Sequence, residues 1–341
     1  MKFIDLYAGI GGIRFAFERA GAKCVFSSEW NKFSQITYAI LHGDIPHGDI
    51  TLIPKDKIPN HNILTAGFPC QPFSLAGVSK KQSAGKSHGF EDPTQGTEFF
   101  KIKEILRIKQ PDAFFLENVK NLLSHDKKKT FEIIAKSLEE VGYDFEKKIV
   151  DSKYWVPQHR ERTFIVGFRK DLNLANKLIS IFPENPKSRK CELIDVLENP
   201  EDIERKYKSL YTVKQGTWEA LKKHKMAHKA KGNGFGYGLI VPPLDGKITR
   251  TLSARYYKDG AEILISQGKG KRPRRLTPLE VYRLQGFPKE FEYLFDGENK
   301  SIQPVSDNQI YKQFGNSVSV PVVTAIAKNI INVIKTSKSM V

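Results

Sequence analysis

Short apolar runs alternate with helix-period segments through the first half of this 341-residue chain, and this order limits the folds that it can adopt. Four runs, bounded by Gly, Asn, Asp or Pro, are typical of buried strands: KFIDLYA, KCVFSSEW, HNILTAGF and DAFFLENV. Helix-period patterns cover residues 12–19, 32–41, 97–109 and 130–141. The alternation predicts an α/β protein with a parallel sheet and helices on both faces. Two further runs, YDFEKKIVDS and RTFIVGFR, are predicted to form the far edge of that sheet.

The second half of the chain has a different character. After Arg169 the alternation fades, and residues 183–266 are basic, glycine-containing and irregular. We therefore expect a first domain over residues 1–182, and a second, smaller, strand-rich domain with its hinge over residues 183–303. The closing segment, residues 304–341, contains SVPVVTAIAKNIINVIK, which is apolar at helical spacing and is predicted to dock on the first domain.

The charge balance favours a polyanionic partner. The chain has 55 Lys and Arg residues against 38 Asp and Glu residues, which gives a net charge of +17. Nucleic acid is the leading candidate, because binding of a basic protein releases condensed counterions; a basic surface that serves only solubility would have the same composition.

The cysteines and the apolar runs indicate a compartment. Cys24, Cys70 and Cys191 are far apart and show no metal-ligand spacing, so we expect a reducing interior and no metal site. The N-terminus has no secretory cleavage pattern, and no run approaches the roughly 20 apolar residues of a membrane helix. A cytoplasmic protein without a membrane partner is expected.

A nucleoside pocket is predicted at the carboxyl ends of the first strands. Gly9, Gly11 and Gly12 follow the first strand and open the first helix, where glycines let the backbone approach a ligand. The third glycine of the dinucleotide fingerprint is replaced by Arg14, which disfavours a pyrophosphate cofactor. Three side chains at strand ends complete the pocket: Glu29 for a ribose diol, Trp30 as an aromatic wall and Asp49 for an adenine amino group. Each residue alone could be structural, but their combination favours a nucleoside.

The stretch GFPCQPFS holds a cysteine rigidly at the end of a buried strand. Pro69 and Pro72 restrict the backbone around Cys70, which fixes the direction of its sulfur. Since ligands bind at the carboxyl ends of parallel strands, the thiol should face the cofactor crevice. The reactive species would be the thiolate, which nearby positive charge favours.

A glutamate and two arginines are predicted to lie beside this cysteine. Glu117 ends the next strand, where a buried carboxyl group with a raised pKa could bind a ring nitrogen and an exocyclic amine. Arg160 and Arg162 in VPQHRER are predicted to share one face of a strand. They could orient Glu117, bind a backbone phosphate or favour the thiolate, and a capping or salt-bridged role for Glu117 remains an alternative.

The motifs, read together, resemble those of a known family. DLYAGIGG, EW, GDI, GFPCQPFS, ENV, VPQHRERTFIVGF, RRLTPLEVYRLQGFP and YKQFGNSV are similar, in this order, to the motif set of the DNA (cytosine-5) methyltransferases. The resemblance covers nearly the whole chain except residues 183–270. It implies a Rossmann-like S-adenosylmethionine-dependent methyltransferase sheet with a target-recognition domain, and a bacterial restriction–modification enzyme, since no regulatory extension is present. The family usually has an apolar residue where this chain has Glu98 in GTEFF.

The resemblance also implies roles for individual residues. Cys70 would add to carbon 6 of a flipped-out cytosine, Glu117 would bind the ring nitrogen and amino group, and Arg160 and Arg162 would support the base and the thiolate. S-adenosylmethionine would be the cofactor. The residues implied to line it, together with the glycines of the first turn, are Tyr7, Gly9, Ile10, Gly11, Gly12, Glu29, Trp30, Asp49, Ile50, Pro69, Asn316 and Val318.

Double-stranded DNA is the expected partner, and separate segments are predicted to contact it. The polar segment after Cys70 would close over the DNA, with Ser79, Gln82 and Ser83 as candidates to fill the vacated stack. Sequence reading is assigned to the second domain, with these candidates: Arg250, Arg255, Tyr256 and Tyr257. We expect a monomer associated with the nucleoid, and a cognate restriction endonuclease acting separately is a further candidate partner.

Three other functions compete with DNA methylation. A transfer RNA cytosine-5 methyltransferase would use the same scaffold, but the basic second region is of a size to contact a duplex groove. A cysteine hydrolase would need a histidine partner, and His159, the only histidine near a proposed motif, is predicted to point away from Arg160. A binding protein with a dead site is disfavoured because the cysteine, the glutamate and both arginines are present.

Overall fold

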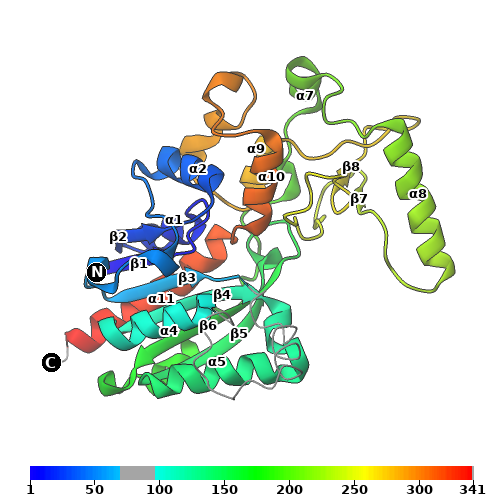
Figure 1. Ribbon diagram of the computed structural model, residues 1–341. Helices are drawn as coiled ribbons and strands as arrows, with labels where there is room; N and C mark the ends of the chain where they lie inside the picture. Colours follow the sequence, from blue (N-terminus) through cyan, green and yellow to red (C-terminus); the bar gives the residue numbers. More distant parts are fainter. Residues whose placement is uncertain (70–96, 340–341) are drawn as a thin grey trace, which may run out of the picture.

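A six-stranded sheet forms the centre of the computed structural model, which describes residues 1–69 and 97–339 (Figure 1). Its strand order is β2-β1-β3-β4-β6-β5. The strands span Lys2–Leu6 (β1), Lys23–Ser28 (β2), Ile63–Gly67 (β3), Ala113–Val119 (β4), Tyr143–Asp151 (β5) and Glu161–Arg169 (β6). Each of the six runs predicted to be a strand therefore forms one, and β5 lies at the far edge as predicted.

The sheet is mixed, so the prediction of a parallel sheet is correct only for its first four strands. β1 pairs in parallel with β2 and β3, and β3 pairs in parallel with β4. β6 runs antiparallel to both β4 and β5. The connection between β5 and β6, residues 152–160, is too short for the crossover that a parallel pair requires.

Helices cover both faces of the sheet (Figure 1). The helices of the first half span Gly12–Arg19 (α1), Lys32–His42 (α2), Thr97–Lys109 (α4) and Lys129–Glu140 (α5), which confirms the predicted helices to within a residue at each end. Alternate residues of each strand point to opposite faces, so Phe3 of β1 joins one hydrophobic core and Ile4 joins the other. The core around Ile4 contains residues of α4 and α5, and the core around Phe3 contains residues of α1.

Residues 183–303 are not rich in strands, and that prediction is wrong. The described elements of this region are the helices Leu193–Val196 (α6), Pro200–Tyr207 (α7), Gln215–Ala230 (α8) and Pro278–Leu284 (α9), several single 3-10 turns and the two-residue strands Leu239–Ile240 (β7) and Leu264–Ile265 (β8). The glycine-containing runs form loops, whereas the Ala, Leu, Met and Lys residues of α8 favour a helix. Figure 1 shows α8 projecting at the side of the molecule away from the sheet.

The last two helices bring the end of the chain back to the sheet. They span Asp307–Asn316 (α10) and Val320–Lys338 (α11), and α11 packs against α1. By length and composition alone, the segment Asp307–Lys338 could cross a membrane, but 56% of its most apolar window is buried inside the protein. Ile326, Ile330 and Ile334 of α11 belong to the same hydrophobic core as Phe3, which is the packing of a core helix.

Candidate active site

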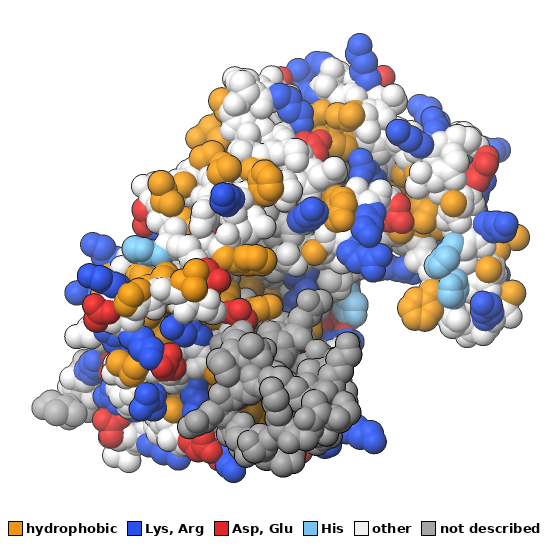
Figure 2. All heavy atoms as spheres, in the orientation of Figure 1, with side chains coloured by type: hydrophobic (Ala, Val, Ile, Leu, Met, Phe, Trp, Pro, Cys, Tyr) orange, Lys and Arg blue, Asp and Glu red, His pale blue; other side chains and the backbone are white. Residues whose placement is uncertain are grey.

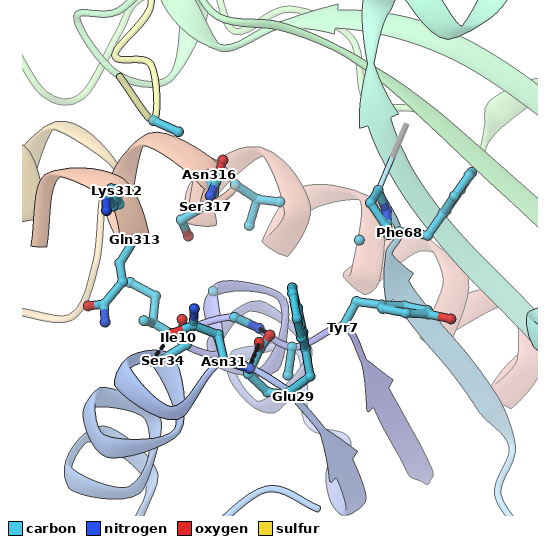
Figure 3. A pocket seen from close by; sticks show the side chains of 18 of the residues that line it. Tyr7, Ile10, Glu29, Asn31, Ser34, Phe68, Lys312, Gln313, Asn316 and Ser317 are labelled. Carbon is cyan, nitrogen blue, oxygen red and sulfur yellow. Dashed lines mark hydrogen bonds between the residues drawn. The ribbon is translucent and has the colours of Figure 1, made fainter. Parts of the chain in front are cut away.

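A cavity of about 1050 Å³ lies at the carboxyl ends of the four parallel strands (Figure 3). This is where open α/β sheets bind their ligands. All of the residues predicted to bind the cofactor line the cavity except Gly11, and Glu117 and Arg162 line it too. The lining residues from the predicted cofactor set are Tyr7, Gly9, Ile10, Gly12, Glu29, Trp30, Asp49, Ile50, Pro69, Asn316 and Val318.

The turn between β1 and α1 depends on glycine. Gly9 and Gly11 have φ angles of 58° and 79°, a left-handed conformation that side chains disfavour. Gly11 is the N-cap residue of α1 and does not line the cavity, and a Cβ there would overlap the His42 imidazole. Gly11 therefore shapes the turn, and its neighbours Gly9 and Ile10 line the cavity.

Glu29 fastens this turn to the end of β2. One carboxylate oxygen accepts a hydrogen bond from the backbone N–H of Gly9 at 2.8 Å, and the other accepts from the N–H of Asn31 at 2.7 Å. Burial raises the pKa of Glu29, and these backbone donors oppose that rise. A carboxylate has about four acceptor positions, so Glu29 can still accept a hydrogen bond from a ligand hydroxyl.

Two more carboxylates, Asp49 and Glu98, line the cavity, and with Glu29 they define its acidic half. Asp49 accepts hydrogen bonds from the N–H and hydroxyl groups of Thr51, both at Oδ1, which leaves Oδ2 for a ligand. Glu98 also lines the cavity, and its backbone carbonyl accepts a 2.9 Å hydrogen bond from the Tyr7 hydroxyl. Trp30 lies beside these groups with 74% of its surface exposed, so its ring is open to stacking. This half is acidic and aromatic, which suits a nucleoside or a cation better than a phosphate.

Glu117 and Arg162 form an ion pair at the other end of the cavity. Arg162 Nε lies 3.1 Å from Glu117 Oε1, because β4 and β6 pair side by side at their ends. Glu117 is only 8% exposed. Burial raises the pKa of Glu117, and the positive charges of Arg162 and Arg160 oppose that rise. The prediction that Glu117 lies close to an arginine in the cofactor crevice therefore agrees with the geometry.

Arg160 has a different position from the one predicted, because it does not line the cavity. Its side chain is 1% exposed, and its guanidinium donates hydrogen bonds to the carbonyls of Leu252, Gly315 and Ser317. It also lies outside β6, so strand alternation does not place it beside Arg162. Arg160 is thus a buried cross-link between three distant segments of chain rather than a group that can touch a ligand.

Cys70 lies outside the described residues, but the chain that leads to it forms part of the cavity. Gly67 pairs in register with Glu117, and Pro69 lines the cavity. The Asn118 side chain donates a 2.9 Å hydrogen bond to the carbonyl of Phe68, which fixes the end of β3 against the end of β4. The residue before Cys70 is therefore held at the cavity wall.

The C-terminal segment supplies the wall opposite the strand ends. Gln313 of α10 donates to the carbonyl of Phe33 at 3.0 Å and accepts from the hydroxyl of Thr37 at 3.0 Å, so α10 is attached to α2 (Figure 3). This attachment holds Asn316 and Val318 in the cavity lining.

Sequence reasoning missed several residues of the cavity wall: Asn31, Phe33, Ser34, Phe68, Lys312, Gln313 and Ser317. Three of them adjoin a predicted residue: Asn31 follows Trp30, Phe68 precedes Pro69, and Ser317 lies between Asn316 and Val318. One feature of the sequence could have indicated Gln313: it lies three positions before Asn316 in a helix, so the two residues share a helix face. This spacing does not show that Gln313 packs against α2.

The residues predicted to contact DNA are in different environments. Ser79, Gln82 and Ser83 lie outside the described residues. Arg255 and Tyr257 line the main cavity, whereas Arg250 lines a separate cavity of about 280 Å³ with Lys225, Tyr237 and Glu262. Tyr256 is fully buried, and its hydroxyl donates to the Ile263 carbonyl and accepts from the Leu276 N–H. Its side chain holds the loop together and is not available to read a DNA groove, which contradicts its predicted role.

Comparisons with known proteins give one consistent result. Residues 1–332 match the family model described as C-5 cytosine-specific DNA methylase. The chain is 49% identical to the type II methyltransferase M.SsoII of Shigella sonnei, over 97% of this chain and 80% of that protein. It is 46% identical to the DNA-cytosine methyltransferase of Escherichia coli K12, over 96% of this chain and 76% of that protein.

Solved structures show the same fold at lower identity. The crystal structure of the Dnmt2 methyltransferase of S. pombe superposes with a TM-score of 0.70 at 21% identity, and covers 97% of this chain and 98% of that one. The chain therefore shares the fold of that solved structure. From the family match and the identity over nearly the full length, this chain belongs to the C-5 cytosine-specific DNA methylase family and is a DNA (cytosine-5) methyltransferase.

Proposed function

We propose that this protein transfers a methyl group from S-adenosylmethionine to carbon 5 of a cytosine that is flipped out of a short duplex DNA sequence, as the modification enzyme of a type II restriction–modification system. One observation carries the proposal: the Glu117–Arg162 pair and the acidic, aromatic half with Glu29 and Asp49 line one cavity. A base and a nucleoside cofactor can thus be bound side by side. The names of the relatives, which are type II methyltransferases, support the biological setting.

The acidic half of the cavity fits S-adenosylmethionine, which has a positive sulfur and no phosphate. Glu29 would accept hydrogen bonds from the ribose hydroxyls, Asp49 would accept from the adenine amino group, and the exposed ring of Trp30 would stack on the adenine. Glu98 adds a further carboxylate to this half, where the family usually has an apolar residue. When bound, the cofactor supplies an electrophilic methyl group.

Glu117 and Arg162 would recognise the target cytosine. A protonated Glu117 can donate to the ring nitrogen N3 while its other oxygen accepts from the amino group, and burial favours the protonated form. Arg162 holds the Glu117 side chain from β6 and can donate to the remaining carbonyl oxygen of the base. The pair would therefore bind the cytosine edge and neutralise the charge that develops on the ring.

Cys70 is the proposed nucleophile, and the position of Pro69 in the cavity wall supports this role. Its thiolate would add to carbon 6 of cytosine, and the ring electrons displaced toward N3 would be neutralised by the proton of Glu117. Carbon 5 then becomes nucleophilic enough to take the methyl group. Removal of the proton from carbon 5 and departure of the Cys70 sulfur would restore the aromatic ring and free the enzyme.

Arg160 is proposed as a positioning residue. Its hydrogen bonds to the carbonyls of Leu252, Gly315 and Ser317 join the C-terminal segment to the loop at Leu252. Its charge also acts on Glu117. It would thus support the base-binding pair without touching the base.

The remaining parts of the chain receive roles by the same reasoning. Residues 1–182 would form the catalytic and cofactor-binding domain, residues 183–303 the target-recognition domain with its hinge, and residues 304–341 the returning segment. Arg250 would read DNA from the second region, and Ser79, Gln82 and Ser83 would fill the gap left by the flipped base. We expect the enzyme to act as a monomer on chromosomal DNA in the cytoplasm, with a restriction endonuclease acting separately.

The competing functions have less support. The likeness to Dnmt2 structures, at about 20% identity, concerns the fold, so it does not favour an RNA substrate. For a cysteine hydrolase, no histidine lines the cavity among residues 1–69 and 97–339; His159 instead bonds to Asp151 at 2.6 Å. In the same described ranges no group of three or more His, Cys, Asp or Glu side chains could hold a metal ion.

The proposal predicts where a transferred label will appear. Incubation with S-adenosylmethionine labelled in its methyl group should convert cytosine in mixed-sequence duplex DNA to labelled 5-methylcytosine. Transfer RNA and duplex DNA without cytosine would be tested in parallel. Bisulfite sequencing of DNA from cells that express the protein would then identify the target sequence. Label that enters only transfer RNA, or no nucleic acid at all, would contradict the proposed function.

A further inference from the structure

A loop of the 183–303 region forms part of the wall of the main cavity. Arg160 donates to the carbonyls of Leu252 at 2.8 Å and Gly315 at 3.0 Å, so one guanidinium joins the start of this loop to the end of α10. Gly315 packs directly on the peptide of Ser253, and a Cβ at Gly315 would overlap the Ser253 carbonyl. The loop is therefore fixed against α10 at the cavity, rather than being free to follow a DNA groove.

Two cations face the cavity where the loop meets α10. Arg255 comes from the loop and is exposed, so it lies at the opening of the cavity. Lys312 comes from α10 and is half-buried (Figure 3). Neither side chain forms an ion pair with a carboxylate in the described part of the chain. Two unpaired cations from different segments of chain at one opening indicate an anionic ligand.

The ring of Tyr257 holds one of these cations in place. Lys312 Nζ lies 4.7 Å from the centroid of the Tyr257 ring, which is within the range of a cation–π interaction. The Tyr257 carbonyl in turn accepts a 3.3 Å hydrogen bond from Arg275. The Tyr257 ring thus positions Lys312, and the hydrogen bond from Arg275 fixes the backbone of Tyr257. A lysine that serves only solubility would not require such positioning.

We propose that Arg255 and Lys312 bind the phosphodiester backbone of the DNA at the flipped nucleotide, and that Tyr257 positions Lys312 for this contact. This inference rests on the proposed function, since a base that enters the cavity leaves its phosphates at the opening. Figure 2 shows Lys and Arg side chains gathered where the body of the molecule meets the part that carries α8. Such contacts fix the position of the DNA without reading its sequence. Arg255 and Tyr257 are thereby reassigned from sequence reading to backbone binding.

The test measures DNA affinity as a function of salt, with a duplex that contains the methylation target. For the Lys312→Gln and Arg255→Gln variants, the slope of log affinity against log salt concentration should fall by about one each, because each cation releases about one counterion. The loss of affinity should be equal for target and non-target duplexes. Affinity for S-adenosylmethionine, measured without DNA, should stay within about twofold of the unsubstituted protein.

Variants of Tyr257 separate positioning from folding. Tyr257→Phe keeps the ring and should keep the salt slope, whereas Tyr257→Leu should reproduce much of the Lys312→Gln change. Lys328→Gln serves as the matched control, because Lys328 is an exposed lysine on α11 away from the cavity lining.

Three results would overturn the inference. The first is an unchanged salt slope in the Lys312 and Arg255 variants. The second is a loss of S-adenosylmethionine affinity in Lys312→Gln, which would assign Lys312 to the carboxylate of the cofactor. The third is a change of target sequence in Arg255→Gln. Failure of the unsubstituted protein to form 5-methylcytosine would instead contradict the proposed function. The binding test and the activity test therefore fail separately.

Discussion

Replacing Glu117 with glutamine should lower the rate of methyl transfer by about a hundredfold or more, because glutamine has the shape of glutamate but cannot give a proton to the cytosine ring. The expected loss is in kcat. The amide still fills the space beside Arg162, so the affinities for DNA and for S-adenosylmethionine should change little. Single-turnover rates with labelled cofactor would measure the effect.

The pH dependence provides a second measure of the same residue. Burial raises the pKa of Glu117, so its protonated form persists to higher pH than in an exposed glutamate. A step that needs the proton of Glu117 should be fastest below this raised pKa and should slow as the pH increases through it. In Glu117→Gln this slowing should disappear, because no proton is lost from the amide.

A control is available on the neighbouring strand. Glu161 begins β6 and pairs with Lys120 at 2.6 Å, and it does not line the cavity. Glu161→Gln removes a carboxylate one position from Arg162, so it tests for general electrostatic effects. Equal losses in the two variants, or a Glu117→Gln enzyme with a normal rate, would be inconsistent with the proposed role of Glu117.

The second large effect is expected at Cys70. Cys70→Ser should reduce turnover by about ten-thousandfold or to background, because a serine hydroxyl is scarcely ionised at neutral pH and adds poorly to carbon 6. Binding of the duplex should be retained, since the substitution changes one atom. Gel-shift affinity and labelled-methyl turnover on the same preparation would show whether the two properties separate.

Cys24 is the matched control for this experiment. Its thiol donates to the Phe26 carbonyl, and burial raises its pKa to about 12, so it is not a nucleophile at neutral pH. Cys24→Ser should therefore keep its activity. Full turnover in Cys70→Ser would remove the covalent step from the proposed mechanism.

Much of the sheet could be predicted from local pattern. Buried strands have continuous apolar runs, and amphipathic helices between them have a 3.6-residue period, so elements such as α1 and α4 have the predicted bounds. The direction of β6 was missed, although the short connection from β5 is a signal for an antiparallel pair. The helix α8 was not predicted, because none of its residues is buried and its sequence therefore lacks the apolar period of a helix that packs on a core.

For the site, too, residues placed by local sequence could be predicted, and residues placed by the tertiary fold could not. Glu29 and Glu117 could be placed because they lie at the carboxyl ends of β2 and β4, and parallel strands end together. Asp49 lines the cavity as predicted, but it does not end a strand: it precedes a 3-10 turn, and only an isolated bridge between His47 and Ser28 brings its segment to the sheet. Arg160 could not be placed correctly, because its partners Leu252 and Gly315 are brought to it only by the tertiary fold. For the same reason the sequence alone did not indicate that Tyr257 meets Lys312, or that Tyr256 is buried.

The most direct measurement is to trap the enzyme on its substrate with duplex DNA in which the target cytosine has fluorine at carbon 5. Fluorine cannot leave as a proton does, so a sulfur bonded to carbon 6 should remain attached after the methyl group arrives. Mass spectrometry of the digested complex should find the nucleotide on the peptide that contains Cys70, and only when S-adenosylmethionine is present. Methylation of ordinary DNA with no such adduct, or an adduct on Cys24 or Cys191, would contradict the claim that Cys70 attacks the cytosine in the cavity that also binds the cofactor.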